Sequence, residues 1–342
     1  MPFLYPYHGD VELNEDANLD PSQVDDVRGQ RGGGGRFRLP GGLGGSGGGA
    51  GGPGIKLPAG KAGIAVVAVV LLCLCGFLCL GQGGLGGLGG LGSLGGLTGT
   101  EADTATSAPL DETCSRQNVN RFDDPACVNL AFVNSVQAYW QRALPENFGR
   151  PYQTATTRYF SGAVSTGCGA ADAGVGPFYC PADNHVYIDL TFYDELASRF
   201  GAPGQFAQAY VIAHEYGHHV QTLLGTEAQM RRQQQRDPGN ANRLSVLLEL
   251  QADCYAGAWA HAATSTTDAG GQPLFTSVTE RDIQQALAAA AAVGDDTIQK
   301  KAGGRVDEQA FTHGSAQQRQ QWFDQGYRSG DPKRCDTFGN AL

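Results

Sequence analysis

The sequence predicts a mostly helical α+β domain with a small sheet, preceded by a glycine-rich leader and one transmembrane helix. Most of the 51 glycines lie before residue 100, and an uncharged apolar run lies among them. Beyond that run, segments with helical spacing of apolar residues outnumber the two short runs that alternate like strands. The part able to build a hydrophobic core therefore begins at Cys114, and its roughly 230 residues suffice for one domain.

The leader is predicted to be disordered over residues 1–62. Residues 1–30 are polar and acidic, and residues 31–62 consist mainly of glycine with scattered arginine and lysine. A segment of this composition buries too little apolar surface to offset the entropy lost on folding.

A membrane-spanning helix is predicted over residues 63–82. Gly63–Leu80 has 18 residues without a charge, which is near the lower limit for a span. The run begins too late in the chain for a cleaved signal peptide. Lys56 and Lys61 precede it, whereas the first charge beyond it is Glu101. This asymmetry predicts a cytoplasmic N-terminus and an extracytoplasmic C-terminal domain in the cell membrane. A buried hydrophobic helix is the alternative.

Residues 83–113 are predicted to be a flexible linker before the domain at 114–342. Gly-Gly-Leu repeats fill its first half, and the remainder is polar. The repeats are too short and too rich in glycine for a solenoid. Their leucines can alternatively contact lipid or a partner.

Six cysteines lie in the predicted domain, and none forms a CxxC pair, which argues against a cysteine zinc ribbon. An even number beyond a membrane span indicates disulfides in an oxidising compartment. Six cysteines allow 15 pairings. We favour the local closures Cys114–Cys127 and Cys168–Cys180, which leave Cys254–Cys335, with free buried thiols as the alternative.

The first elements of the domain are a helix and two strands. Apolar residues at helical spacing predict a helix over Val128–Arg142, ended by Pro145. Thr154–Ser161 and Val186–Leu190 are predicted strands, separated by a glycine-rich loop over Cys168–Cys180. Alternation in the second strand indicates one exposed face, so we expect an edge strand able to pair with an extended peptide.

The central element is the predicted helix Ala209–Gln221, with the sequence AYVIAHEYGHHVQ. His214 and His218 are four residues apart, which places both imidazoles on one helix face, as a tetrahedral Zn²⁺ site requires. Glu215 follows and can act as general base toward a water at the metal. It is the only formally charged residue of this otherwise largely apolar stretch, so the helix is predicted to be buried. A buried helix with satisfied histidines is the alternative, and His219 points away from the site.

Glu249 is the best candidate for a third zinc ligand. It lies with Asp253 at i,i+4 spacing in a second largely apolar helix, where an unpaired carboxylate would be costly. Asp253 would orient a ligating histidine through its free ring N–H. Two alternatives remain open: Glu249 pairs with an arginine of residues 231–243, or Asp253 binds the metal and Glu249 supports it.

Two further helices are predicted near the C-terminus. Thr279–Val293 has Thr279 as its N-cap and Gly294 as its stop signal. Ser315 caps a helix over Ser315–Gly326. His313 at its entry can hydrogen-bond a developing oxyanion in catalysis. A capping or packing histidine explains it equally well.

Four motifs resemble one known family. They are GPFYCPADNHVYIDL at 176–190, HEYGHHVQ at 214–221, ELQADCYAG at 249–257 and FTHGSAQQR at 311–319. With the glycine-rich leader and single span, they resemble the neutral zinc metallopeptidase family of bacterial membrane-anchored proteins. The resemblance implies a zincin-like domain with a gluzincin-like glutamate motif. It also implies the zinc ligands His214, His218 and Glu249 and the catalytic base Glu215.

The expected function is zinc-dependent hydrolysis of a protein or peptide substrate by a membrane-anchored metallopeptidase. Two alternatives stay open: a surface binding or scaffolding domain without turnover, and a zinc amidase acting on cell-wall linkages. Glu215 argues against the first, because a structural zinc site needs no base. The net charge is −10, and no basic patch interleaved with aromatic residues is present, so no nucleic-acid partner is expected.

Overall fold

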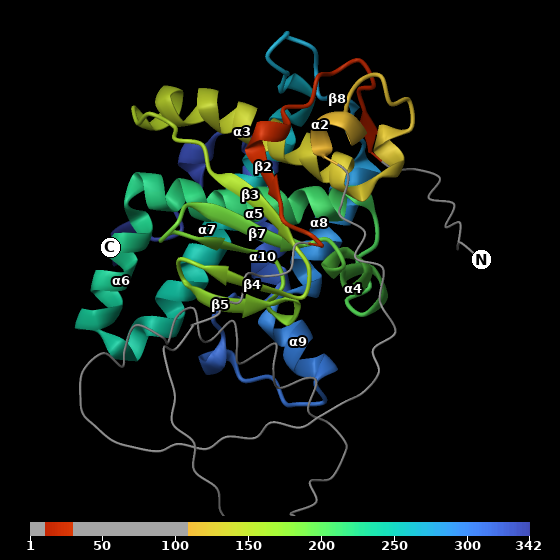
Figure 1. The fold of residues 1–342 in the computed structure, drawn as a ribbon. Helices are drawn as coiled ribbons and strands as arrows, with labels where there is room; N and C mark the ends of the chain where they lie inside the picture. Colours follow the sequence, from red (N-terminus) through yellow and green to blue (C-terminus); the bar gives the residue numbers. More distant parts are fainter. Residues whose placement is uncertain (1–10, 30–108) are drawn as a thin grey trace, which may run out of the picture.

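The computed structural model describes residues 11–29 and 109–342 (Figure 1). The predicted transmembrane helix at 63–82 and most of the predicted linker lie outside these residues. Within the two described ranges, no helix combines the length and apolar character that a membrane crossing requires.

The domain is α+β and mostly helical, as predicted. Its main sheet has the strand order β2-β3-β7-β6, in which only β6 runs antiparallel to its neighbour. The four strands are β2 Val24–Asp26, β3 Thr156–Phe160, β7 His185–Asp189 and β6 Phe178–Cys180. The long helices are α3 Pro125–Phe148, α5 Gln205–Leu224, α7 Ala241–Ala262, α8 Glu280–Ala292 and α10 Ala316–Ser329. Helix α5 contacts α3, α7, α8 and β6, and therefore connects the helical layer to the sheet.

Smaller elements surround this core. Two-stranded sheets pair β1 Glu12–Leu13 with β8 Phe275–Ser277, and β4 Ala163–Thr166 with β5 Gly169–Asp172. The short helices are α2 Leu110–Thr113, α4 Phe192–Ser198, α6 Thr226–Arg236 and α9 Asp295–Lys301.

The predicted helix caps are confirmed. Thr279 and Ser315 each accept a hydrogen bond from the backbone N–H three residues on, within a full capping box. Helix α10 extends to Ser329, three residues beyond the prediction, and stops at Gly330 in the left-handed conformation.

Pro145 does not end the first long helix. It lies inside α3, which continues to Phe148 and ends at Gly149 with φ 63°. A proline near the C-terminus of a helix removes one backbone donor, and the Gly149 N–H bonds the Pro145 carbonyl to complete the last turn.

Two predictions about the sheet are wrong. Cys168–Cys180 is not a loop, since it contains β5 and β6. The strand β7 is not at the edge, because β3 and β6 flank it. The predicted exposed face is absent as well, because Tyr187 and Asp189 are buried like Val186 and Ile188. The edge strands are β2 and β6, and β6 lies in the glycine-rich stretch.

The predicted disorder of 1–62 is wrong for residues 11–29. Strand β1 pairs antiparallel with β8, and β2 pairs parallel with β3. Val11, Ala17 and Val24 are buried. The segment has little apolar surface of its own, but the domain supplies its backbone partners. The predicted linker also ends early, because Leu110 in α2 is buried.

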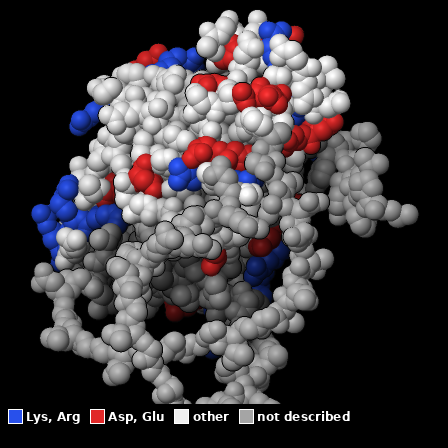
Figure 2. Space-filling model, viewed as in Figure 1, with Lys and Arg blue, Asp and Glu red and all other residues white. Residues whose placement is uncertain are grey.

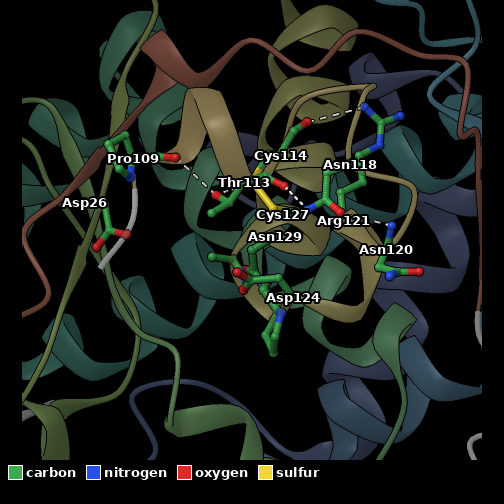
Figure 3. The surroundings of a disulfide bond; sticks show 12 residues. Asp26, Pro109, Thr113, Cys114, Asn118, Asn120, Arg121, Asp124, Cys127 and Asn129 are labelled. Atoms are coloured by element: carbon green, nitrogen blue, oxygen red, sulfur yellow. Dashed lines mark hydrogen bonds between the residues drawn. A yellow bond between two sulfur atoms is a disulfide. The ribbon is translucent and has the colours of Figure 1, made fainter. Parts of the chain in front are cut away.

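All three favoured disulfides are present. Cys114–Cys127 joins α2 to α3 (Figure 3), and Cys168–Cys180 joins the β4–β5 turn to β6. Cys254–Cys335 joins α7 to the C-terminal segment. Since no described cysteine is left over, free buried thiols are excluded for the part of the chain the structure describes.

Candidate metal centre

The three predicted ligands come together between α5 and α7. The rings of His214 and His218 lie one helical turn apart, with centroids separated by 4.8 Å. Glu249 reaches both: its carboxylate oxygens lie 3.2 Å from Nε2 of His214 and 3.5 Å from Nε2 of His218. The three candidate ligand atoms lie within 4.8 Å of one another. Two imidazole nitrogens and one carboxylate oxygen are the protein donors typical of a catalytic zinc site.

Gly217 allows the two helices to approach this closely. A Cβ added at Gly217 would lie 3.0 Å from the Cα of Ala252 and 3.1 Å from its carbonyl oxygen. Backbone atoms of α7 therefore occupy the space that a side chain would need. Because Ala252 lies between Glu249 and Asp253 on α7, this contact sets how far both carboxylates reach toward α5.

We expect Gly217→Ala to weaken zinc binding by about tenfold and to destabilise the domain by about 1–3 kcal/mol, as overpacking does. The added methyl group pushes α7 away and lengthens the distance from Glu249 to both imidazoles. Zinc titration against a competing chelator and thermal unfolding of the apoprotein measure the two effects. Gly239→Ala is the control, because the same added methyl group would there meet no atom closer than 3.6 Å. Equal zinc affinity in Gly217→Ala and wild type would contradict this role.

Asp253 lies behind His214. Its Oδ1 is 2.8 Å from Nδ1 of that ring, which leaves Nε2 for the metal. Arg319 of α10 donates to both Asp253 oxygens, at 2.8 and 2.9 Å, and Tyr210 donates to Oδ1. All four side chains are buried. This arrangement disfavours Asp253 as a metal ligand, because its oxygens face the ring nitrogen turned away from Glu249.

Arg319 was not predicted as a site residue. The signal in the sequence was its place on the buried face of α10, four residues before Phe323 and seven before Gly326. A charged residue on the apolar face of a helix needs a buried partner. No spacing in the sequence identifies Asp253 as that partner.

His218 is held in a similar way by a residue that the sequence did not single out. Its Nδ1 lies 2.8 Å from Oε1 of Gln221. The Gln221 amide in turn donates to the Leu248 carbonyl and to Gln251. Both imidazoles therefore have Nδ1 engaged and Nε2 directed toward Glu249.

The two glutamates of the site experience opposite electrostatic effects. Burial raises the pKa of Glu215 above its ordinary value. Burial also opposes ionisation of Glu249, but the imidazoles of His218, His313 and His214 outweigh it and hold the pKa of that carboxyl well below its usual range. A carboxylate that stays ionised suits a metal ligand, whereas a raised pKa suits a group that exchanges protons.

His313 lines the same cavity as the candidate ligands. Its Nδ1 lies 3.2 Å from Oδ1 of Asp295, for which the sequence suggested no role. The other oxygen of Asp295 accepts hydrogen bonds from three successive backbone N–H groups, those of Thr312, His313 and Gly314. Burial lowers the pKa of His313, but the Glu249 and Asp295 carboxylates outweigh it and raise that pKa. The Thr312 hydroxyl and Asp295 both contact Nδ1, so Nε2 is the ring nitrogen outside these two contacts.

The cavity beside these residues has a volume of about 960 Å³. Strand β6, α4, α5, α6 and α9 contribute to its walls, together with the chain that follows α4. Much of its lining is apolar: Val175, Phe178, Phe192, Phe200, Val211, Met230, Leu248 and Ile298. The candidate ligands therefore line a space large enough for several amino-acid side chains.

Other histidines and arginines lie away from this centre. His219 contacts the Gln153 carbonyl and the Tyr179 hydroxyl, on the far side of α5 from Glu249. His185 contacts the Asp183 carbonyl. Figure 2 shows Lys and Arg gathered over α6, which carries Arg231. That arginine pairs with Glu227 of its own helix and not with Glu249, contrary to one of the alternatives.

A family model described as "Putative neutral zinc metallopeptidase" matches residues 15–338. The chain belongs to this family. It is 48% identical over 244 residues to "Uncharacterized protein Rv2575" of Mycobacterium tuberculosis, which covers 71% of this chain and 80% of that protein. It is 43% identical over 241 residues to "Uncharacterized protein YpfJ" of Escherichia coli K12, covering 69% of this chain and 80% of that protein. No solved structure matches the chain. Family membership supports a hydrolase as the broad class and zinc as the cofactor.

Proposed function

We propose that this chain is a zinc-dependent peptidase with a zincin-like site of the gluzincin type. The observation that carries the proposal is the convergence of His214, His218 and Glu249 within 4.8 Å, from two helices far apart in the sequence. Glu215 lies on the same helix, buried and with a raised pKa. In a structural zinc site, four protein ligands complete the coordination and no base is needed. Three ligands beside a glutamate therefore favour a catalytic site over a scaffolding domain without turnover.

Each residue has a separate task in the proposed reaction. Zinc, when bound by the three ligands, supplies Lewis acidity that activates a water and polarises the scissile carbonyl. Glu215 accepts the proton of the attacking water and passes it to the leaving amine. His313, held by Asp295, donates a hydrogen bond from Nε2 to the oxygen that gains negative charge. Asp253 and Arg319 keep His214 in one orientation.

Peptides are the proposed substrates because of the groups around the cavity. The edge strand β6 lines it through Phe178 and Tyr179 and offers a backbone edge to an extended chain. The apolar lining fits hydrophobic side chains better than hydroxyl-rich glycan. A cell-wall amide linkage is the second candidate, since the zinc centre itself does not distinguish between amides.

The compartment is also part of the proposal. Three disulfides in one domain are typical of an oxidising environment, which favours an extracytoplasmic domain. The apolar run within residues 63–82 is the proposed point of membrane association. The zinc domain is then residues 109–342 completed by residues 11–29.

Removal of the metal tests the function directly. We expect the purified full chain to cleave casein or a peptide library, to lose this activity with a zinc chelator and to regain it when zinc is restored. Purified cell wall, assayed in parallel, separates the two substrate classes. Release of cell-wall fragments without peptide cleavage would favour the amidase. Activity that survives complete loss of zinc would contradict both.

A further inference from the structure

The N-terminal segment, residues 11–29, is built into the domain from which residues 30–108 separate it in the sequence. Strand β2 forms the edge of the main sheet beside β3, and β1 pairs with β8 (Figure 1, red). The family match begins at residue 15, within this segment. The segment thus contributes one of the four strands in the sheet against which α5 packs.

Arg121 is the main polar anchor for this segment. Its side chain is only 2% exposed. Nη2 donates to the backbone carbonyls of Asn14, Glu15 and Ala17, at 3.2, 2.8 and 2.8 Å. Nη1 lies 3.4 Å from the Cys114 carbonyl beside the disulfide (Figure 3). Without residues 11–29, three of these four acceptors would be absent and a guanidinium would be left poorly satisfied in the protein interior.

Polar side chains of α3 form hydrogen bonds with Asp20 and Gln23 of the segment. Asn134 accepts from the Asp20 N–H at 2.7 Å and donates to the Asp20 carbonyl at 3.1 Å. Its amide also donates to Gln23, as does the amide of Gln137. On the sheet, Arg158 pairs with Asp25 at 2.6 Å. These contacts match donor to acceptor along the segment, which a nonspecific contact would not do.

We infer that residues 11–29 and 109–342 fold as one unit and therefore lie on the same side of any membrane. The chain between them can cross a bilayer only an even number of times, including none. This replaces the predicted topology in which a single crossing at 63–82 leaves the N-terminus in the cytoplasm. The charge argument for that topology used only Lys56, Lys61 and Glu101 near the apolar run. It did not include the pairing of residues 11–29 with strands of the domain. The inference does not depend on the proposed function, since Arg121, Asn134 and Gln137 lie outside the zinc site.

Cysteine labelling of the full chain in cells tests this. Glu15→Cys and Val119→Cys are made separately in a background in which Cys73, Cys75 and Cys79 are replaced by alanine. The other six cysteines form disulfides, so the introduced cysteine is the free thiol. Both positions are exposed, Val119 by 81%. A membrane-impermeant maleimide is applied before and after lysis. We expect the two variants to give the same pattern, either both labelled in intact cells or both protected. Labelling of one position in intact cells and of the other only after lysis would overturn the inference.

Crosslinking provides a second readout in case a variant is mislocalised. Asp25→Cys and Arg158→Cys, combined in the same background, replace side chains that touch and are partly exposed. A short bis-maleimide should join them in membranes or extracts of cells expressing the full chain, with the two single variants as controls. The linked peptide, identified by mass spectrometry, supports the inference. Its absence while both cysteines are singly modified would overturn it.

Discussion

The Glu215→Gln variant is expected to retain zinc and to lose about 1,000-fold in kcat, the range over which a general base typically contributes. Glutamine has the shape of glutamate but cannot accept the proton of an attacking water. The buried position of Glu215, beside His214 yet outside the group of three ligands, makes the loss specific to proton transfer. Peptide cleavage assays and metal analysis of the same preparation measure the two properties.

Glu227→Gln is the matched control for that variant. Glu227 lines the same cavity, but its carboxylate pairs with Arg231 on α6 and not with the metal centre. We expect it to keep most of the wild-type kcat. The proposed mechanism fails if Glu215→Gln cleaves peptides as fast as the wild type, or if Glu227→Gln loses as much activity as Glu215→Gln.

The Arg319→Met variant is expected to destabilise the domain by about 3–5 kcal/mol, as the loss of one partner from a buried ion pair does. The side chains of Arg319 and Asp253 are 3% and 0% exposed. Methionine fills a similar volume but leaves the Asp253 carboxylate without its cation. Thermal and denaturant unfolding of the purified protein measure the change.

Arg328→Met on the same helix is the control for this effect. Arg328 pairs with Asp324 one turn away, and its side chain is 78% exposed. Water screens such a pair, so its loss should leave stability almost unchanged. If Arg319→Met unfolds at the wild-type temperature, Asp253 does not depend on the guanidinium, and the orientation proposed for His214 loses its support.

The grouping of His214, His218 and Glu249 was predictable because each residue has a local signal. Four-residue spacing in α5 places His214 and His218 on one face, and the apolar surroundings of Glu249 mark a carboxylate that needs a partner. The distance between α5 and α7 had no such signal. It depends on Gly217 and Ala252 meeting across an interface, which only the packed structure shows.

Residues that act through partners distant in the sequence were harder to predict. Arg319 contacts the site from α10, and Asp295 contacts His313 from the start of α9. Neither residue has a spacing that points to its partner. The segment 11–29 looked disordered because its own composition is polar. Its order comes from Arg121 and β3, more than 90 residues away in the chain. Local spacing therefore predicted the grouping of the three candidate ligands better than local composition predicted the boundaries of the domain.

The most direct test of the zinc centre is X-ray absorption spectroscopy at the zinc edge on the purified full chain. The site described here predicts one zinc per chain with two imidazole nitrogens and protein carboxylate oxygen in its first shell, and no sulfur. It also predicts that Glu249→Ala weakens zinc binding and loses the carboxylate contribution. A sulfur-containing shell, or a spectrum that is the same in Glu249→Ala and wild type, would contradict it.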